Sequence, residues 1–74
     1  MADYAARIEK LLAPLVGDFM AKMAVKSQCK SLGITPDQIG SQHLEALSKK
    51  IGDAIAFHGH RDQAAGITDK IKKL

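Results

Sequence analysis

The chain is poor in cysteine and in aromatic residues: it has one cysteine, one tyrosine, two phenylalanines and no tryptophan. A single cysteine excludes a disulfide within the chain, and its unpaired thiol favours a reducing, cytoplasmic setting. The aromatic residues are dispersed, whereas a surface that stacks nucleic-acid bases needs several of them close together. No apolar run approaches the roughly 20 residues of a membrane-spanning helix, so we expect no membrane segment.

The 74 residues predict a single domain, 1–74, with a small hydrophobic core. A chain of this length buries only about 60% of its unfolded surface, and such domains often gain stability from a partner chain. The net charge of +3 is too small to indicate nucleic-acid binding by itself. We therefore expect a protein partner, most simply a second copy of the chain, and rank nucleic acid below it.

Apolar residues recur every three or four positions along most of the chain, and no segment alternates with period two. This spacing predicts an all-α fold, a small bundle of three to four helices with a long N-terminal helical region. Its longest helical stretch, from Leu15 to Leu32, is apolar over roughly 200° of its circumference, whereas a surface helix needs only about 100°. Such a helix requires neighbours on at least two sides, and we expect a homodimer to supply one of them.

Pro14 interrupts the N-terminal helical region. It cannot donate a hydrogen bond to the Lys10 carbonyl, and it disfavours helical geometry at Ala13. It either begins a new helix or kinks a continuous one. Because Ala13 is a poor cap and the apolar spacing continues through the proline, we expect a kinked, continuous helix.

Further start and stop signals divide the remainder of the chain. Asp3 is placed to cap the first helix, and Gly33 to end the Leu15–Leu32 helix. The run Thr35–Gln38, TPDQ, has the sequence of a capping box with proline at the first helical position. This run either begins the next helix or forms one short turn before a helix that Ser41 caps. Gly59 is expected to end that helix.

The third and fourth helices each carry one apolar face. The expected inward residues are Leu44, Leu47, Ile51, Ala54, Ile55 and His58 in the third helix, and Ala64, Ile67, Ile71 and Leu74 in the fourth. Gly66 lies inside the fourth helix, where glycine costs up to about 1 kcal/mol relative to alanine. We expect close packing against a neighbouring helix to explain it.

Small side chains gather on the central helix at Gly17, Ala21 and Ala24, next to Met20. They allow another backbone to approach closely. This patch is either a tight helix crossing inside the fold or a symmetric self-association surface. These four residues are our candidate interface.

Lys22, Lys26 and Lys30 recur at four-residue steps and form a basic stripe on the same helix. The first interpretation is a solvated helix face, in which Asp18 forms an ion pair with Lys22. An acidic protein partner is the second interpretation, and the phosphates of a nucleic acid are the third.

The residues that resemble metal ligands are His58 and His60, together with His43 and Cys29. A structural zinc site needs four ligands, commonly in two short pairs. One H-x-H pair and two isolated residues do not supply that pattern, so we expect no metal and no cofactor. We expect His58 to face inward, His60 to lie near the start of the last helix, and Cys29 to be an unreactive thiol near a helix C-terminus.

The C-terminal run GHRDQAAGITDKIKKL resembles the last helix of sterile-alpha-motif domains. The resemblance covers about a fifth of the chain. It rests on Gly59, His60, Arg61, Ile67, Ile71 and Leu74. Gly66 and the absence of an early tryptophan depart from the family pattern. The resemblance implies helical protein–protein interaction.

No catalytic sequence motif is present: the chain lacks G-x-S-x-G, a P-loop, H-E-x-x-H and the dinucleotide-binding glycine pattern. We expect a non-enzymatic protein–protein interaction or adaptor module that self-associates, with a regulatory or signalling role. The alternative is a small DNA-binding or transcription-associated protein that reads DNA with the 35–55 region. A weaker alternative is a metal- or haem-binding sensor that uses His58 and His60.

Overall fold

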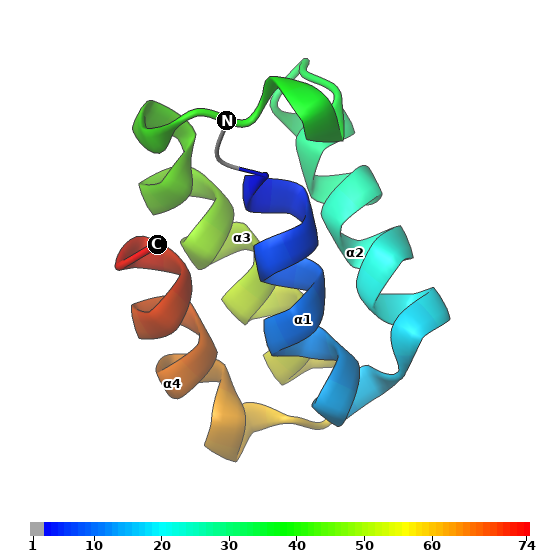
Figure 1. Cartoon of the computed structure of the whole chain (residues 1–74). Helices are drawn as coiled ribbons and strands as arrows, with labels where there is room; N and C mark the ends of the chain where they lie inside the picture. The colour runs from blue at the N-terminus through cyan, green and yellow to red at the C-terminus, as the bar shows by residue number, and fades with distance from the viewer. Residues whose placement is uncertain (1–2) are drawn as a thin grey trace.

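Four α-helices form the protein in this computed structural model, which describes residues 3–74 (Figure 1). The helices are α1 (Tyr4–Val16), α2 (Asp18–Ser31), α3 (Leu44–Phe57) and α4 (Arg61–Lys72), and two short 3-10 turns, η1 (Pro36–Gln38) and η2 (Ser41–His43), join α2 to α3. No strand occurs within residues 3–74. The predicted all-α architecture is confirmed.

The helices are arranged as two hairpins, α1 with α2 and α3 with α4 (Figure 1). Contacts of α2 with α3 and of α1 with α4 join the hairpins into one bundle. The α1–α2 turn at Gly17 and the α3–α4 turn at Gly59 lie at the same end, the lower end in Figure 1. We call this the glycine-turn end, and the η1–η2 connection crosses the opposite end.

The expectation of a continuous helix kinked at Pro14 is wrong. Pro14 lies inside the last turn of α1, and the break comes three residues later at Gly17. Gly17 has φ 87°, in the left-handed region that glycine occupies readily. Its N–H donates to the Ala13 carbonyl at 2.8 Å, while its own carbonyl accepts from the Ala21 N–H at 2.9 Å. One residue therefore ends α1 and begins α2, so Leu15 and Leu32 do not belong to one helix.

The predicted helix start at Asp3 and the predicted stop at Gly33 are confirmed. The Asp3 carboxylate accepts a hydrogen bond from the Ala6 N–H at 3.1 Å and caps α1. Gly33, with φ 77°, follows α2, and the Ile34 N–H donates to the Cys29 carbonyl at 3.0 Å. A hydrogen bond that spans six residues in this way, together with a glycine at positive φ, defines a Schellman cap.

The TPDQ run forms the short turn η1, as one of the two interpretations expects. The Gln38 side chain accepts from the Thr35 N–H at 2.9 Å, which is one half of a capping box. The expected Ser41 cap is not formed. Instead the Gly40 N–H donates to Nδ1 of His43 at 2.9 Å, so His43 closes the turn that precedes α3.

A single hydrophobic core fills the bundle. It consists of Ala5, Ile8, Leu12, Ala21, Val25, Cys29, Ile39, Leu44, Leu47, Ile51, Ile55, Ile67 and Ile71. The predicted apolar faces of α3 and α4 supply six of these residues, and Ala54, Ala64 and Leu74 of the same faces are half-buried. One predicted inward residue differs. His58 is exposed rather than inward, because α3 ends at Phe57 and His58 is its C-cap.

The tight helix crossing lies between α3 and α4. A Cβ added at Gly52 would overlap the Thr68 hydroxyl, whereas a Cβ at Gly66 would meet no atom within 4 Å. The Thr68 hydroxyl donates to the Ser48 carbonyl at 3.2 Å across this crossing. The expectation that Gly66 packs closely is therefore wrong, and Gly52 is the glycine that packing requires.

Candidate interaction surface

An apolar groove of about 530 Å³ opens at the glycine-turn end of the bundle. Its lining comes from the last turns of α1, from α2 between Met20 and Gln28, from the end of α3 and from the α3–α4 turn: Leu12, Leu15, Val16, Met20, Met23, Ala24, Ser27, Gln28, Ala54, Ile55, His58 and His60. No residue in this lining is acidic, and none is a lysine or an arginine. The groove therefore suits an apolar occupant rather than a charged one.

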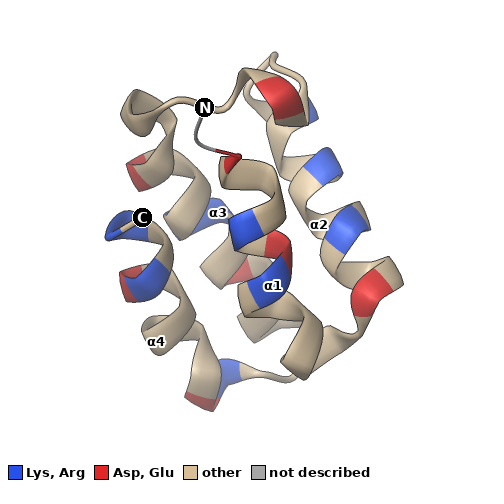
Figure 2. Cartoon of the chain, viewed as in Figure 1, with Lys and Arg blue, Asp and Glu red and all other residues tan. Residues whose placement is uncertain are grey.

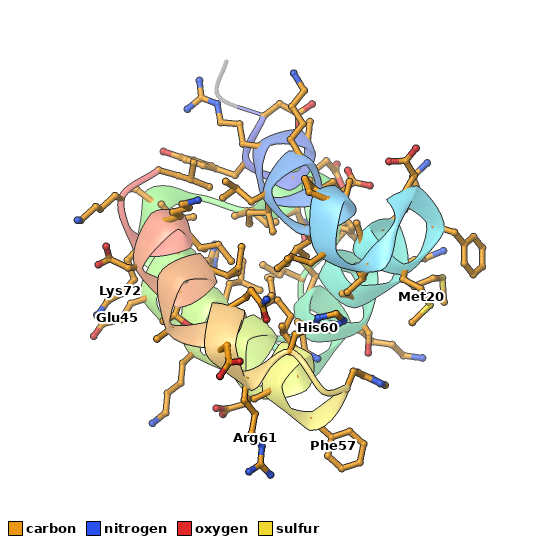
Figure 3. The ribbon with its side chains drawn as sticks, turned by 90° about the horizontal axis from the view of Figure 1, so that it is seen from below. Met20, Glu45, Phe57, His60, Arg61 and Lys72 are labelled. Carbon is orange, nitrogen blue, oxygen red and sulfur yellow. The ribbon has the colours of Figure 1, made fainter. Side chains whose placement is uncertain are left out.

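Within residues 3–74, four large apolar side chains remain exposed; two of them line the groove, and each of the other two immediately precedes a lining residue in the chain. Phe57 is 86% exposed and Phe19 is 74% exposed, and Met20 and Met23 are each nearly half exposed. Met20, His60 and Phe57 are seen together when the bundle is viewed from this end (Figure 3). Phe19 is four residues before Met23 on α2, the spacing of neighbours on one helix face. We call Phe19, Met20, Met23 and Phe57 the apolar rim.

The turn at Gly59 places the two histidines on the groove. Gly59 has φ 96°, and the His60 N–H donates to the Ile55 carbonyl at 3.0 Å, which closes α3 with a Schellman cap. His60 then lies at the start of α4, as predicted; it occupies the N-cap position without a side-chain capping hydrogen bond and is half-buried. The exposed His58 ring meets the Phe57 ring edge to face, with centroids 5.5 Å apart. This contact joins Phe57 to a residue that lines the groove.

The four candidate interface residues do not form one surface. Ala21 is fully buried in the core, so it serves the helix crossing inside the fold. Ala24 is half-buried and lines the groove with Met20. Gly17 is exposed at the turn, where its conformation rather than its small size is needed. Of the four, Met20 and Ala24 face the groove.

The lysine stripe is exposed along the outer side of α2 (Figure 2). Lys22, Lys26 and Lys30 lie outside the groove lining. The expected ion pair of Asp18 with Lys22 is not formed: within the described part of the chain, the one ion pair joins Lys73 to Asp69 at 2.9 Å. The stripe is thus a row of solvated cations next to the apolar rim.

The candidate metal ligands are separated. His58 and His60 share the groove, whereas Nδ1 of His43 already accepts from the Gly40 N–H in the turn before α3. Cys29 is fully buried in the core, and this burial raises the pKa of its thiol. Among residues 3–74, no three histidine, cysteine or acidic side chains are grouped so that they could hold a metal ion.

The sequence interpretation missed three of the four residues of the apolar rim. The spacing names Met20 as a candidate interface residue but not Met23, and it treats the two phenylalanines, Phe19 and Phe57, only as scarce aromatics. The signal was available in part, because Phe57 falls outside the Leu47–Ile51–Ile55 spacing of its helix. Phe19 could be recognised only once the helix was known to begin at Asp18, which places Phe19 in its first turn.

Comparisons with known proteins assign neither a family nor a function to the chain. No family model, no curated protein and no solved structure matches this chain. The likeness of the C-terminal run to sterile-alpha-motif domains thus stays a local resemblance. Of the helices described, none is long and apolar enough to cross a bilayer.

Proposed function

We propose that the protein is a non-enzymatic, self-associating interaction module, and that a second copy of the chain covers the apolar rim and its groove. One observation carries this proposal. Within residues 3–74, two of the four exposed large apolar side chains, Met20 and Met23, line one groove at one end of the bundle. The other two, Phe19 and Phe57, are the chain neighbours of its lining residues Met20 and His58. Isolated exposed apolar residues are normal on protein surfaces, but a contiguous patch of them marks an interaction site.

The size of the patch is in the range that a dimer needs. Because a whole phenylalanine side chain offers about 200 Å², Phe19 and Phe57 at these exposures offer roughly 300 Å² in each copy. With the two methionines and the groove floor added, two copies would bury about 1,000 Å², the lower limit for a specific interface. Interfaces at this low end of the size range are typical of weak, transient complexes, so we expect a dissociation constant in the micromolar range.

A second copy suits the shape of this surface. Each copy presents a groove and, beside it, a protruding aromatic ring at Phe57. In a two-fold dimer the same patch meets itself, so the ring of each copy can enter the groove of the other. Met20 and Met23 are flexible and polarisable, which helps a groove adapt to an inserted ring.

A dimer also compensates for the small core of a 74-residue chain. We place this association in the cytoplasm, because the thiol of Cys29, the single cysteine, has no partner with which to form a disulfide. A regulatory or signalling role would then depend on whether the groove is open or covered.

Sedimentation of the purified protein from about 1 µM to 1 mM tests the proposal, a range that brackets a micromolar dissociation constant. The wild type should pass from monomer to dimer, and Met20→Glu and Met23→Glu should each remain monomeric. Ala46→Glu adds the same charge at an exposed site on α3 outside the groove, so it should dimerise like the wild type. Thermal unfolding followed by circular dichroism verifies that each variant is folded.

A wild type that stays monomeric at 1 mM overturns the proposal. A dimer that survives both methionine substitutions overturns the assignment of the surface. DNA binding is the competing function, and it would use the lysine stripe. That function predicts that the logarithm of the affinity for duplex DNA falls linearly with the logarithm of the salt concentration. It also predicts that Lys26→Glu abolishes DNA binding, whereas Met20→Glu and Met23→Glu leave it unchanged.

A further inference from the structure

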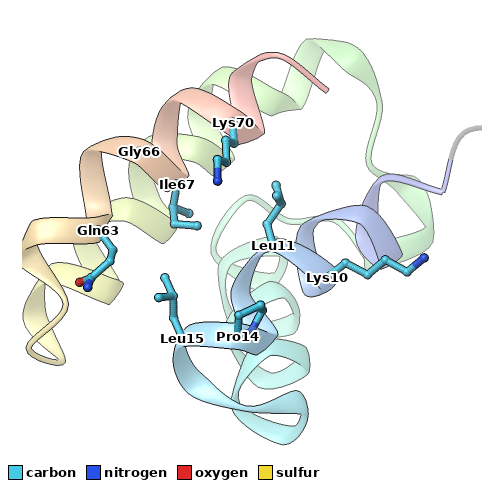
Figure 4. A pocket seen from close by; sticks show the side chains of 8 residues that line it. All are labelled: Lys10, Leu11, Pro14, Leu15, Gln63, Gly66, Ile67 and Lys70. Carbon is cyan, nitrogen blue, oxygen red and sulfur yellow. The ribbon is translucent and has the colours of Figure 1, made fainter.

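A second cleft, of about 370 Å³, lies between α1 and α4 (Figure 4). These two helices make the least extensive contact of the adjacent helix pairs in the bundle. The walls of the cleft are mainly apolar and come from Leu11, Pro14 and Leu15 on one side and Ile67 on the other, with the polar side chain of Gln63 at one end (Figure 4). Leu15 also reaches the groove described above, but no other residue is shared.

Gly66 forms the mouth of this cleft, and the fold does not otherwise explain it. The residue lies inside α4, its φ is not positive, and a Cβ there would meet nothing within 4 Å. Neither backbone conformation nor close packing therefore requires glycine, although glycine weakens the helix. The effect of the missing side chain is to leave the space beside Ile67 open.

The charged residues of this cleft are both basic. Lys10 and Lys70 line it, no acidic residue does, and neither lysine is in an ion pair in the part of the chain described. The Lys70 side chain points into the space between Ile67 and Leu11, whereas Lys10 extends away along the outer edge (Figure 4). An apolar cleft with an unpaired ammonium group at its mouth is complementary to an anion that carries a hydrocarbon tail.

We infer that this cleft binds a small amphiphilic anion, a carboxylate with a medium-length alkyl chain. The carboxylate pairs with Lys70, and the chain lies between Leu11, Leu15 and Ile67. The volume is at the lower end of the range for ligand sites, which favours a single short chain over a complete phospholipid. This inference is independent of self-association, because the apolar rim lies outside the cleft.

Decanoate, used below the concentration at which it forms micelles, is the probe. Titration of the isotope-labelled protein followed by NMR should shift the amide signals of Leu11, Gly66 and Ile67. The cation decyltrimethylammonium has the same tail and should not bind. Equal binding of the anion and the cation, or no binding of decanoate, overturns the inference.

Two pairs of variants assign the site. Lys70→Glu should weaken decanoate binding by about tenfold, the loss of roughly one charge-assisted hydrogen bond. Lys72→Glu makes the same charge change two residues away, outside the cleft, and should bind like the wild type. Gly66→Leu should close the mouth and weaken binding, whereas Ala65→Leu, at an exposed site outside the lining, should not. If the two variants of either pair change decanoate binding equally, the assignment of the ligand to this cleft is overturned.

A flotation assay with phosphatidylglycerol vesicles distinguishes a free ligand from a membrane surface. The protein should bind decanoate and remain unbound in the presence of the vesicles. Binding to the vesicles without binding to free decanoate overturns the inference in favour of a lipid surface.

Discussion

Gly52 of α3 lies directly against the side-chain hydroxyl of Thr68 on α4, with no room for a Cβ between them. The hydroxyl is held in place because it donates to the Ser48 carbonyl one turn earlier on α3. Ser48 is itself buried, and its own hydroxyl donates to the Glu45 carbonyl at 2.6 Å. Three small or hydroxyl-bearing residues thus lie at the most extensive helix contact in the bundle.

We expect Gly52→Ala to destabilise the fold by about 1–3 kcal/mol, the usual cost of overpacking. The added methyl group would force Thr68 to rotate and give up its hydrogen bond to Ser48. This cost outweighs the gain of about 1 kcal/mol that alanine brings to a helix. Urea unfolding measures the difference.

Gly66→Ala is the matched control for this substitution. It is the same change on the neighbouring helix, but at a position with open space. It should raise the free energy of unfolding by up to about 1 kcal/mol. Two shifts of the same sign would contradict the packing described for Gly52.

The break between α1 and α2 gives a second prediction. Gly17→Ala should cost about 1–2 kcal/mol, because an L-residue is strained at φ 87°. Pro14→Ala should instead stabilise α1 by up to about 3 kcal/mol, since it restores a backbone donor inside the helix. Urea unfolding of the two variants measures these changes in the free energy of unfolding. A Gly17→Ala variant as stable as the wild type would show that Gly17 does not define the turn.

Local signals in the sequence predicted much of the fold. The Asp3 cap, the stops at Gly33 and Gly59, and the apolar faces of α3 and α4 each depend on residues within one or two helical turns. The α1–α2 break at Gly17 was not predicted, because the proline was the stronger sequence signal and a kinked, continuous helix was expected there. Here the tertiary arrangement needs a reversal of direction, which a glycine at positive φ supplies and a proline inside a helix does not.

The candidate surface was less predictable. Ala21 and Met20 are adjacent on one apolar helix, yet Ala21 is fully buried and Met20 is 47% exposed. Which side of α2 faces the core depends on where α3 lies, and that is a long-range relation that residue spacing does not contain. The 200° apolar arc correctly indicated that the fold would leave part of α2 uncovered, but did not show which part.

The hydrogen bond between Thr35 and Asp37 gives a third prediction. The Thr35 hydroxyl donates to the Asp37 carboxylate and lowers the pKa of that carboxyl below 3.8. The stability that this hydrogen bond contributes is therefore present above pH 3.8, and it is lost as the pH falls through the lowered pKa of Asp37. Thr35→Val should raise the pKa of Asp37, and Thr35→Ser, which keeps the hydroxyl, should not. An NMR titration of the Asp37 carboxyl carbon measures this pKa in the two variants. An unchanged pKa in Thr35→Val would contradict the hydrogen bond from Thr35 as the cause of the shift.

The buried thiol of Cys29 gives the last prediction. Burial raises its pKa above the ordinary value of 9.0, so the folded protein favours the neutral thiol and the unfolded chain ionises first. The stability that this thiol contributes is fully present below pH 9 and is lost as the pH rises through the raised value. The difference in free energy of unfolding between the wild type and Cys29→Ala should therefore narrow above pH 9.

Thiol reactivity measures the same burial independently. Because no part of Cys29 is exposed, Ellman's reagent should react with the native protein only when the bundle opens. The rate at pH 8 should lie far below that of an unstructured cysteine peptide, and it should rise with urea in step with the unfolding equilibrium. Gly52→Ala, which weakens the bundle at a distant helix crossing, should accelerate the reaction. A native rate equal to that of the peptide would contradict the position of Cys29 in the core.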